Sequence, residues 1–108
     1  VLAANLAHGE QRALEIATAL ATRPRLMLLD EPVAGMGAEE TRRMIEFLST
    51  LKGRKTMILV EHDMDAVFSL ADRISVLVYG RIIATGTPQE IRANVEVRRA
   101  YLGEEVAA

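Results

Sequence analysis

One stretch of the sequence limits the possible fold more than any other: residues 25–32 read RLMLLDEP. A continuous apolar run leads into two carboxylates, Asp30 and Glu31, and Pro32 then ends the extended segment. A short apolar run bounded by turn signals is typical of a strand that is buried on both faces, as in a parallel sheet. We therefore predict a central parallel strand over residues 26–29 with two acids at its carboxyl end.

These two acids are candidates for a functional site because ligands of open α/β sheets bind at the carboxyl ends of the strands. Burying a carboxylate is unfavourable unless it meets a metal, a cation or a reacting water. A hard oxygen ligand at this point suits Mg²⁺ shared with a nucleotide phosphate. The second acid would then orient or deprotonate an attacking water. An equally simple interpretation is that both acids only cap the turn that follows the strand.

The rest of the chain alternates helical and extended patterns, which indicates α/β architecture. We expect one helix from Gly9 to the segment before Pro24 and a second, of about three turns, from Ala38. Residues 56–60 form a second buried strand, and Asp63 can cap a short helix after it. The residues expected to face the core from these helices are Ala13, Ile16, Ala17, Leu20, Met44, Phe47, Leu48, Leu51, Val67 and Leu70.

The C-terminal part of the sequence has a different pattern. Two β-rich runs, residues 74–79 and 82–85, are joined by Gly80-Arg81 and predict a hairpin. Residues 87–90 read TPQE, which is a capping box with proline at the first helical position, so a short helix follows. We expect a last helix over residues 95–102 and a disordered tail over residues 104–108.

Composition excludes several classes of protein. The 108 residues carry a formal net charge of −2, which argues against nucleic-acid binding driven by bulk charge. The chain has no cysteine, so it has neither a disulfide framework nor a thiolate metal site. No apolar run approaches the length of a membrane span. Any membrane role would therefore have to come through a partner.

Four motifs, taken together and in this order, resemble the ATP-binding subunits of ABC transporters. Residues 6–12 read LAHGEQR and resemble the signature motif, residues 30–32 the Walker B motif, residues 34–37 the D-loop, and His62 the H-loop histidine. Within that family, segments such as DEPVAGM, VEHDM and YLGEE are similar to the ATPases of bacterial branched-chain amino acid importers. The ATPases of lipopolysaccharide export are similar as well.

The resemblance implies a partial P-loop NTPase-like core of mainly parallel strands, with a C-terminal hairpin and short terminal helices. It implies that Asp30 holds Mg²⁺, directly or through water, that Glu31 is the catalytic base, and that His62 lies near the γ-phosphate. It also implies an ATP-binding segment at the start of a helix of this chain. Backbone N–H groups of that segment would bind a phosphate of the nucleotide held by a second subunit. The residues of that segment are Leu6, Ala7, His8, Gly9 and Glu10.

Three departures from the family pattern affect these expectations. Ala7 stands where a serine hydroxyl would contact phosphate, His8 replaces a glycine, and Gly37 replaces the polar residue of the D-loop. No window matches the phosphate-binding G-x-x-x-x-G-K-[ST] motif, and the Q-loop is also absent. We therefore interpret residues 1–108 as the C-terminal portion of an ABC ATPase domain that would not bind ATP and Mg²⁺ tightly, or hydrolyse ATP, by itself.

The expected partners are a second ATP-binding subunit and transmembrane permease subunits, which would hold the protein at the cytoplasmic face of the cell membrane. Without a neighbouring strand, the apolar strands would expose a face or an edge, so we also expect self-association. Other interpretations remain open: a truncated paralogue that acts as a non-enzymatic interaction module, a fragment of a lipopolysaccharide-export ATPase, a DNA-repair or chromosome-maintenance ATPase, or an ordinary α/β domain with coincidental motifs.

Overall fold

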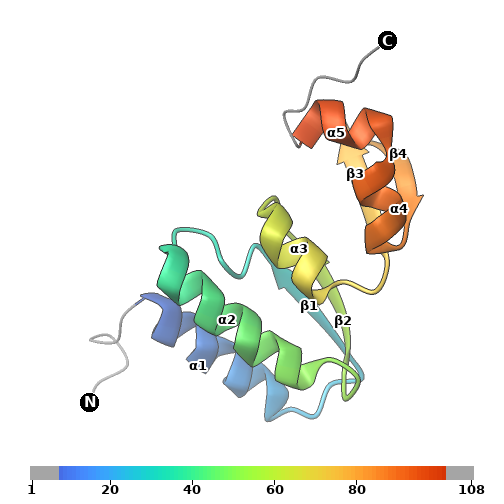
Figure 1. Ribbon diagram of the computed structural model, residues 1–108. Helices are drawn as coiled ribbons and strands as arrows, with labels where there is room; N and C mark the ends of the chain where they lie inside the picture. Colours follow the sequence, from blue (N-terminus) through green and yellow to red (C-terminus); the bar gives the residue numbers. More distant parts are fainter. Residues whose placement is uncertain (1–7, 102–108) are drawn as a thin grey trace. The chain divides into compact units, whose positions relative to one another are not determined.

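The computed structural model of the chain describes residues 8–101 (Figure 1). The chain divides into two compact units, residues 1–70 and residues 71–108. The first unit contains α1 (His8–Leu20), β1 (Leu26–Asp30), α2 (Ala38–Leu51), β2 (Thr56–Val60) and α3 (Met64–Leu70). The second contains β3 (Ile74–Val78), β4 (Arg81–Gly86), α4 (Pro88–Ala93) and α5 (Val95–Tyr101).

The first unit is built on a parallel pair of strands, β1 and β2. The two strands pair in simple register, from Leu26 opposite Thr56 to Asp30 opposite Val60. All three helices of the unit contribute to one core with β1, and the buried residues of that core are Ile16, Met27, Val33, Met44, Leu48, Ala66 and Leu70. The parallel pair and the helices confirm the predicted α/β core.

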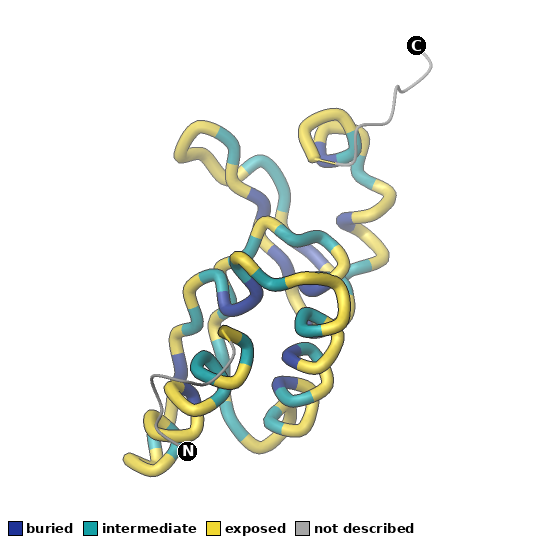
Figure 2. Tube along the Cα trace, turned by 90° about the vertical axis from the view of Figure 1, so that its left-hand side faces the viewer, coloured by how far each residue is buried: buried dark blue, intermediate teal, exposed yellow. Residues whose placement is uncertain are grey.

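The prediction that β1 is buried on both faces is wrong. Met27 is only 4% exposed, but its neighbours Leu26 and Leu28 are 48% and 71% exposed. On β2, Ile58 and Val60 are 52% and 57% exposed in the same alternating pattern. Figure 2 colours the chain trace by burial class. Successive side chains of a strand point to opposite faces of the sheet, so one face of β1–β2 packs on the core and the other is open. The predicted exposed face is therefore observed.

Helices α1 and α2 follow the predicted periodicity with one exception. Ile16 is buried and Ala13 and Leu20 pack against the core, but Ala17 is exposed, so the predicted apolar stripe of α1 is too wide. In α2, Met44 and Leu48 are buried, while the Arg42 side chain pairs with Glu39 and Glu46 on the exposed side. Such exposed pairs contribute little to stability, so burial is what fixes the orientation of α2.

The start of α3 matches the prediction. The Asp63 carboxylate accepts a hydrogen bond from the backbone N–H of Ala66 at 3.0 Å, which is the expected cap. Ala66 is the most deeply buried residue of this helix, and Leu70 is also buried. Val67, which was expected to face the core, is partly exposed.

The second unit is an antiparallel hairpin with two short helices. The predicted hairpin is confirmed, but its turn is Tyr79-Gly80, because β4 already begins at Arg81. Tyr79 and Gly80 both have positive φ, 48° and 74°, as the type I′ turn of a two-residue hairpin requires. The predicted capping box is present at the start of α4, where Thr87 and Glu90 exchange hydrogen bonds. The buried residues of this unit are Ile74, Val76, Ile91 and Val97.

Several predictions concern residues outside the described part of the chain. The tail at residues 104–108 and the end of the last helix beyond Tyr101 are among them, as are Leu6 and Ala7. Within residues 8–101, none of the helices has the length and apolar character needed to cross a membrane.

Candidate functional site

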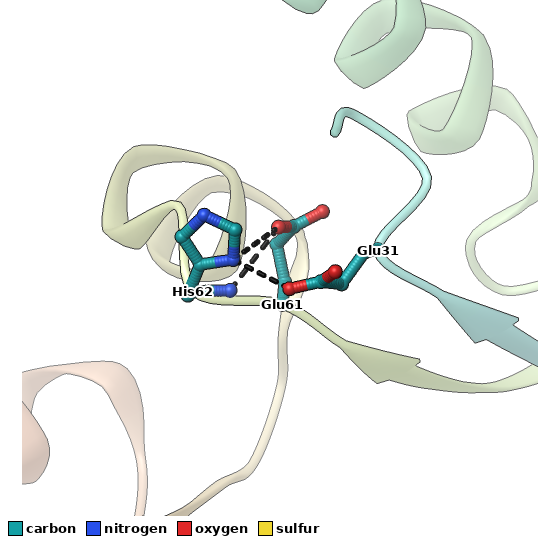
Figure 3. A group of neighbouring side chains, drawn as sticks. All are labelled: Glu31, Glu61 and His62. Carbon is teal, nitrogen blue, oxygen red and sulfur yellow. Dashed lines mark hydrogen bonds and ion pairs between the residues drawn. The ribbon is translucent and has the colours of Figure 1, made fainter. Parts of the chain in front are cut away.

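The site is positioned by the parallel pairing of β1 and β2, whose carboxyl ends lie side by side. The backbone N–H of Glu31 donates to the carbonyl of Val60 at 2.7 Å, so the pairing continues one residue beyond β1. Glu31 therefore follows one strand at the same edge where Glu61 and His62 follow the other (Figure 3). We expected Asp30, Glu31 and His62 to gather around one phosphate at neighbouring strand ends. The structure brings Glu31 and His62 into contact, but Asp30 is not part of that contact.

Glu31 has an unusual backbone conformation. Its φ is +47°, in the left-handed region that residues with a side chain rarely adopt. The chain turns there, and the Glu31 carbonyl accepts a hydrogen bond from the N–H of Ala34 at 3.1 Å. Strained backbone of this kind persists only where the surrounding structure holds it, and it is concentrated at functional sites. The strain falls on the residue that the sequence analysis selected as the base.

The Glu31 and His62 side chains are in direct contact. Nδ1 of His62 donates to Oε1 of Glu31 at 2.6 Å, and the two side chains are 72% and 45% exposed. This hydrogen bond, followed by the negative charge of Glu31 and then those of Glu61 and Asp63, raises the pKa of His62 above its usual value of 6.5. The imidazole is thus held in one orientation and keeps its proton to a higher pH.

Glu61 is the site residue that the sequence analysis missed. Its side chain is 0% exposed. One carboxylate oxygen accepts from the backbone N–H of Val33 at 3.3 Å, and the other accepts from the N–H groups of His62 and Asp63 at 3.1 and 3.4 Å. The available signal was an acid directly after a second apolar strand, which is the same pattern that singled out Glu31 after the first.

Carboxylate and imidazole ligand atoms of Glu31, Glu61 and His62 all lie within 4.8 Å of one another. Asp30, which was predicted to hold Mg²⁺, is not part of this cluster. Its exposed side chain shares the open face of the sheet with Leu28, and it lines an open pocket together with Arg12 and Glu15. An accessible carboxylate is the hard oxygen ligand that Mg²⁺ prefers, so Asp30 fits the predicted ion, whereas the buried Glu61 oxygens are already used by backbone N–H groups.

The predicted ATP-binding segment is described only from His8 onward, where it begins α1. The N–H of Gly9, which we expected to receive a phosphate, donates to Oε2 of Glu40 at 2.9 Å. A Cβ atom at Gly9 would lie 2.7 Å from the same oxygen, so this approach suits glycine. A phosphate at this N–H would have to displace the Glu40 carboxylate. Glu10 lies exposed in the first turn of α1.

The loop after β1, which corresponds to the predicted D-loop, is attached at several points. Val33 is 5% exposed and belongs to the core. Nε2–H of His8 donates to the carbonyl of Ala34 at 3.1 Å, so the start of α1 contacts this loop. Gly37 precedes α2 and provides no side-chain cap. Beyond Glu31, the loop is therefore fixed by the burial of Val33 and by contacts of its backbone.

Two protein families match separate parts of this chain. A family described as "ABC transporter" matches residues 1–34, and a family described as "Branched-chain amino acid ATP-binding cassette transporter" matches residues 81–107. Among solved structures, the ADP conformation of MJ1267, an ATP-binding cassette of an ABC transporter, aligns with a TM-score of 0.79 at 30% identity, covering 93% of this chain and 41% of that one. CbiO1 from Clostridium perfringens, part of an ABC transporter complex, aligns with a TM-score of 0.77 at 31% identity, covering 90% of this chain and 39% of that one.

The chain belongs to the ATP-binding cassette family and corresponds to a C-terminal region of its ATP-binding proteins. Within that family it is similar to the branched-chain amino acid transport ATP-binding protein LivG of Escherichia coli, with 47% identity over 104 residues, 94% of this chain and 41% of LivG. BraF of Pseudomonas aeruginosa is 46% identical over the same share of each chain. The lipopolysaccharide export ATP-binding protein LptB of Haemophilus influenzae is 37% identical over 101 residues, 93% of this chain and 42% of LptB. The chain thus spans about two fifths of the length of these relatives.

Proposed function

We propose that this chain supplies part of the ATP-hydrolysing site of a subunit that drives the import of branched-chain amino acids. The observation that carries the proposal is the contact between Glu31 and His62 at the ends of two parallel strands. It occurs in a chain that is 47% identical to LivG over 104 residues. Two polar groups held together at this edge of an α/β sheet form the kind of arrangement that binds and activates small ligands.

In the proposed reaction, Glu31 orients the attacking water and accepts its proton. Its Oε1 is bonded to His62, which leaves Oε2 as the oxygen that faces the water. His62 fixes the orientation of Glu31 through this hydrogen bond, and when protonated it would place a positive charge close to the developing charge of the terminal phosphate. Asp30 is the residue that would hold Mg²⁺, and that ion, when bound, neutralises charge on the phosphates.

The amino acid substrate is proposed from the comparisons. Residues 81–107 match the family described for branched-chain amino acid transporters, and LivG and BraF share 46–47% identity with this chain, against 37% for LptB. The second unit, which contains this matched segment, therefore favours amino acid import over lipopolysaccharide export.

The proposed partners are a second ATP-binding subunit and transmembrane permease subunits, which would place the protein at the cytoplasmic face of the membrane. The predicted signature segment supports the first partner, because such a segment acts on the nucleotide of a facing subunit. We further propose that residues 1–108 do not bind ATP tightly in isolation.

A chimera tests this function directly. Residues 1–108 replace the corresponding segment of E. coli LivG, and the chimera is produced in cells that lack LivG and need imported leucine for growth. We expect growth to be restored, because the grafted segment supplies the acid, histidine and signature positions. Glu31→Gln in the chimera should abolish growth, whereas Glu46→Gln, on the exposed face of α2, should not.

The possible outcomes distinguish the proposed substrate from the proposed ATPase activity. A chimera that is stably produced and hydrolyses ATP but does not support growth would contradict the substrate, and transfer of the same segment into LptB would then be informative. A chimera that is folded but hydrolyses no ATP would contradict the proposed activity itself.

A further inference from the structure

We propose that Glu61 is a positioning residue that fastens the loop after β1 to the loop after β2 and thereby holds Glu31 and His62 in contact. The contact between the two loops is a property of the chain as it stands. Its consequence for catalysis rests on the function proposed above.

Three hydrogen bonds connect the segments around Glu31, Glu61 and His62 in a ring. Glu31 is two residues before Val33, whose N–H donates to one oxygen of Glu61 at 3.3 Å. Glu61 is followed directly by His62, whose own N–H donates to the other oxygen at 3.1 Å. The ring closes where Nδ1 of His62 meets Glu31 at 2.6 Å. Both loops are thus attached to the same carboxylate. Figure 3 shows the part of this arrangement formed by Glu31, Glu61 and His62.

Glu61 differs sharply in burial from the two residues that it holds. The Glu61 side chain is 0% exposed, whereas those of His62 and Glu31 are 72% and 45% exposed. Exposed ion pairs are weak because water screens them and because two side chains must be ordered. A buried carboxylate bonded to backbone N–H groups is held far more firmly. The exposed pair therefore depends on the buried group beneath it for its geometry.

The chemistry of the Glu61 side chain suits a bridge between the two loops. A carboxylate offers two acceptor oxygens and no donor, which matches N–H groups arriving from both loops. Glutamine has nearly the same shape, but its amide nitrogen would face an N–H donor at one end, so one attachment would be lost. Val33 is itself 5% exposed and packed in the core, so the attachment at Val33 ties the site to the body of the first unit.

The test uses NMR of the whole chain without nucleotide. At about pH 9 imidazole rings are neutral, and the ¹⁵N signals of His62 then report whether the proton resides on Nδ1, as the bond to Glu31 requires, or on Nε2. Glu61→Gln should shift the population toward Nε2–H, to the value found in Glu31→Ala. It should also accelerate hydrogen exchange of the Val33 amide by about tenfold or more, as expected for loss of a bond to a charged group.

A double variant distinguishes positioning from a direct effect of the Glu61 charge on the ring. In the Glu31→Ala background, Glu61→Gln should produce no further shift of the His62 tautomer. The same shift in both backgrounds, or no shift in either, would overturn the proposal. Glu46→Gln is the matched control and should leave both signals unchanged.

A second modification keeps the test valid if Glu61→Gln fails to fold. A semisynthetic chain in which an ester replaces the amide before Val33 lacks the N–H donor but retains Glu61. We expect this chain to shift the His62 tautomer in the same direction, and an unshifted tautomer would overturn the proposal. Because no ATP is present, failure of the proposed ATPase function would not affect either result.

Discussion

At the scale of single residues, the contact between His62 and Glu31 makes a prediction about pH. The pKa of His62 is raised mainly by its hydrogen bond to Glu31 and then by the charge of that residue. We expect an NMR titration of the ring to give a pKa above 6.5, and Glu31→Gln should lower it toward that ordinary value. Glu46→Gln should not change it. A His62 pKa that is the same in the Glu31→Gln variant would contradict the contact.

The same shift has a consequence for stability. Because the folded-state pKa of His62 lies above the unfolded value, the contact stabilises the fold fully below about pH 6.5, and this contribution is lost as pH rises through the raised pKa. Unfolding measured across that window should therefore show a smaller loss of stability with rising pH in Glu31→Gln than in the unmodified chain. If the stability of the two proteins depended on pH in the same way, this prediction would be contradicted.

Glu31 could be selected from the sequence because it follows an apolar run, and ligands bind at the carboxyl ends of such strands. His62 was selected through its resemblance to the H-loop histidine of ABC transporter ATPases. Sequence reasoning missed Glu61 and Glu40 for a physical reason. Glu61 does follow an apolar strand, but its partner Val33 and the Gly9 partner of Glu40 are distant backbone N–H groups, and the sequence does not indicate which N–H a carboxylate will meet. The roles of Asp30 as a magnesium ligand and of Glu31 as a base stay predictions.

At the scale of elements, hydrophobic periodicity predicted which helices and strands exist. It failed on the faces of β1, where a continuous apolar run indicated burial on both sides but Leu28 is 71% exposed. An apolar run indicates that its side chains favour burial. It does not indicate whether another segment of this chain covers both faces of the strand. The turn of the hairpin was misplaced by one residue because Tyr79 adopts the positive φ that is usually left to glycine or asparagine.

The role of α2 in the core gives a prediction about stability. Leu48 is 1% exposed and packs in the core of the first unit. Leu48→Ala should lower the free energy of unfolding of that unit by about 2–5 kcal/mol, because it removes buried methyl groups and leaves a cavity. Leu28→Ala, at an exposed position of β1, should cost much less. The free energy of unfolding of each variant can be measured by urea denaturation, monitored through the NMR signals of residues 8–70. Equal losses of stability in Leu48→Ala and Leu28→Ala would contradict the described core.

At the scale of the whole molecule, the open face of β1–β2 predicts self-association. Leu26, Leu28, Ile58 and Val60 expose apolar side chains on this face, and such surfaces favour contact with another chain. We expect light scattering to detect dimers or larger species at working concentration. The double variant Leu28→Lys/Ile58→Lys should shift the protein toward monomer, whereas Leu77→Lys, exposed on the hairpin, should not. A monodisperse monomer of the unmodified chain would contradict this prediction.

The central claim is that Glu31, positioned by His62 and Glu61 at the end of β1, activates water for ATP hydrolysis in the complete subunit. The most direct measurement is the steady-state ATP hydrolysis rate of the purified LivG chimera with and without Glu31→Gln. We expect the substitution to reduce the rate by about 100-fold or more, the usual contribution of a general base, while ATP binding is retained. Hydrolysis at the unmodified rate by a chimera carrying Glu31→Gln would contradict the account.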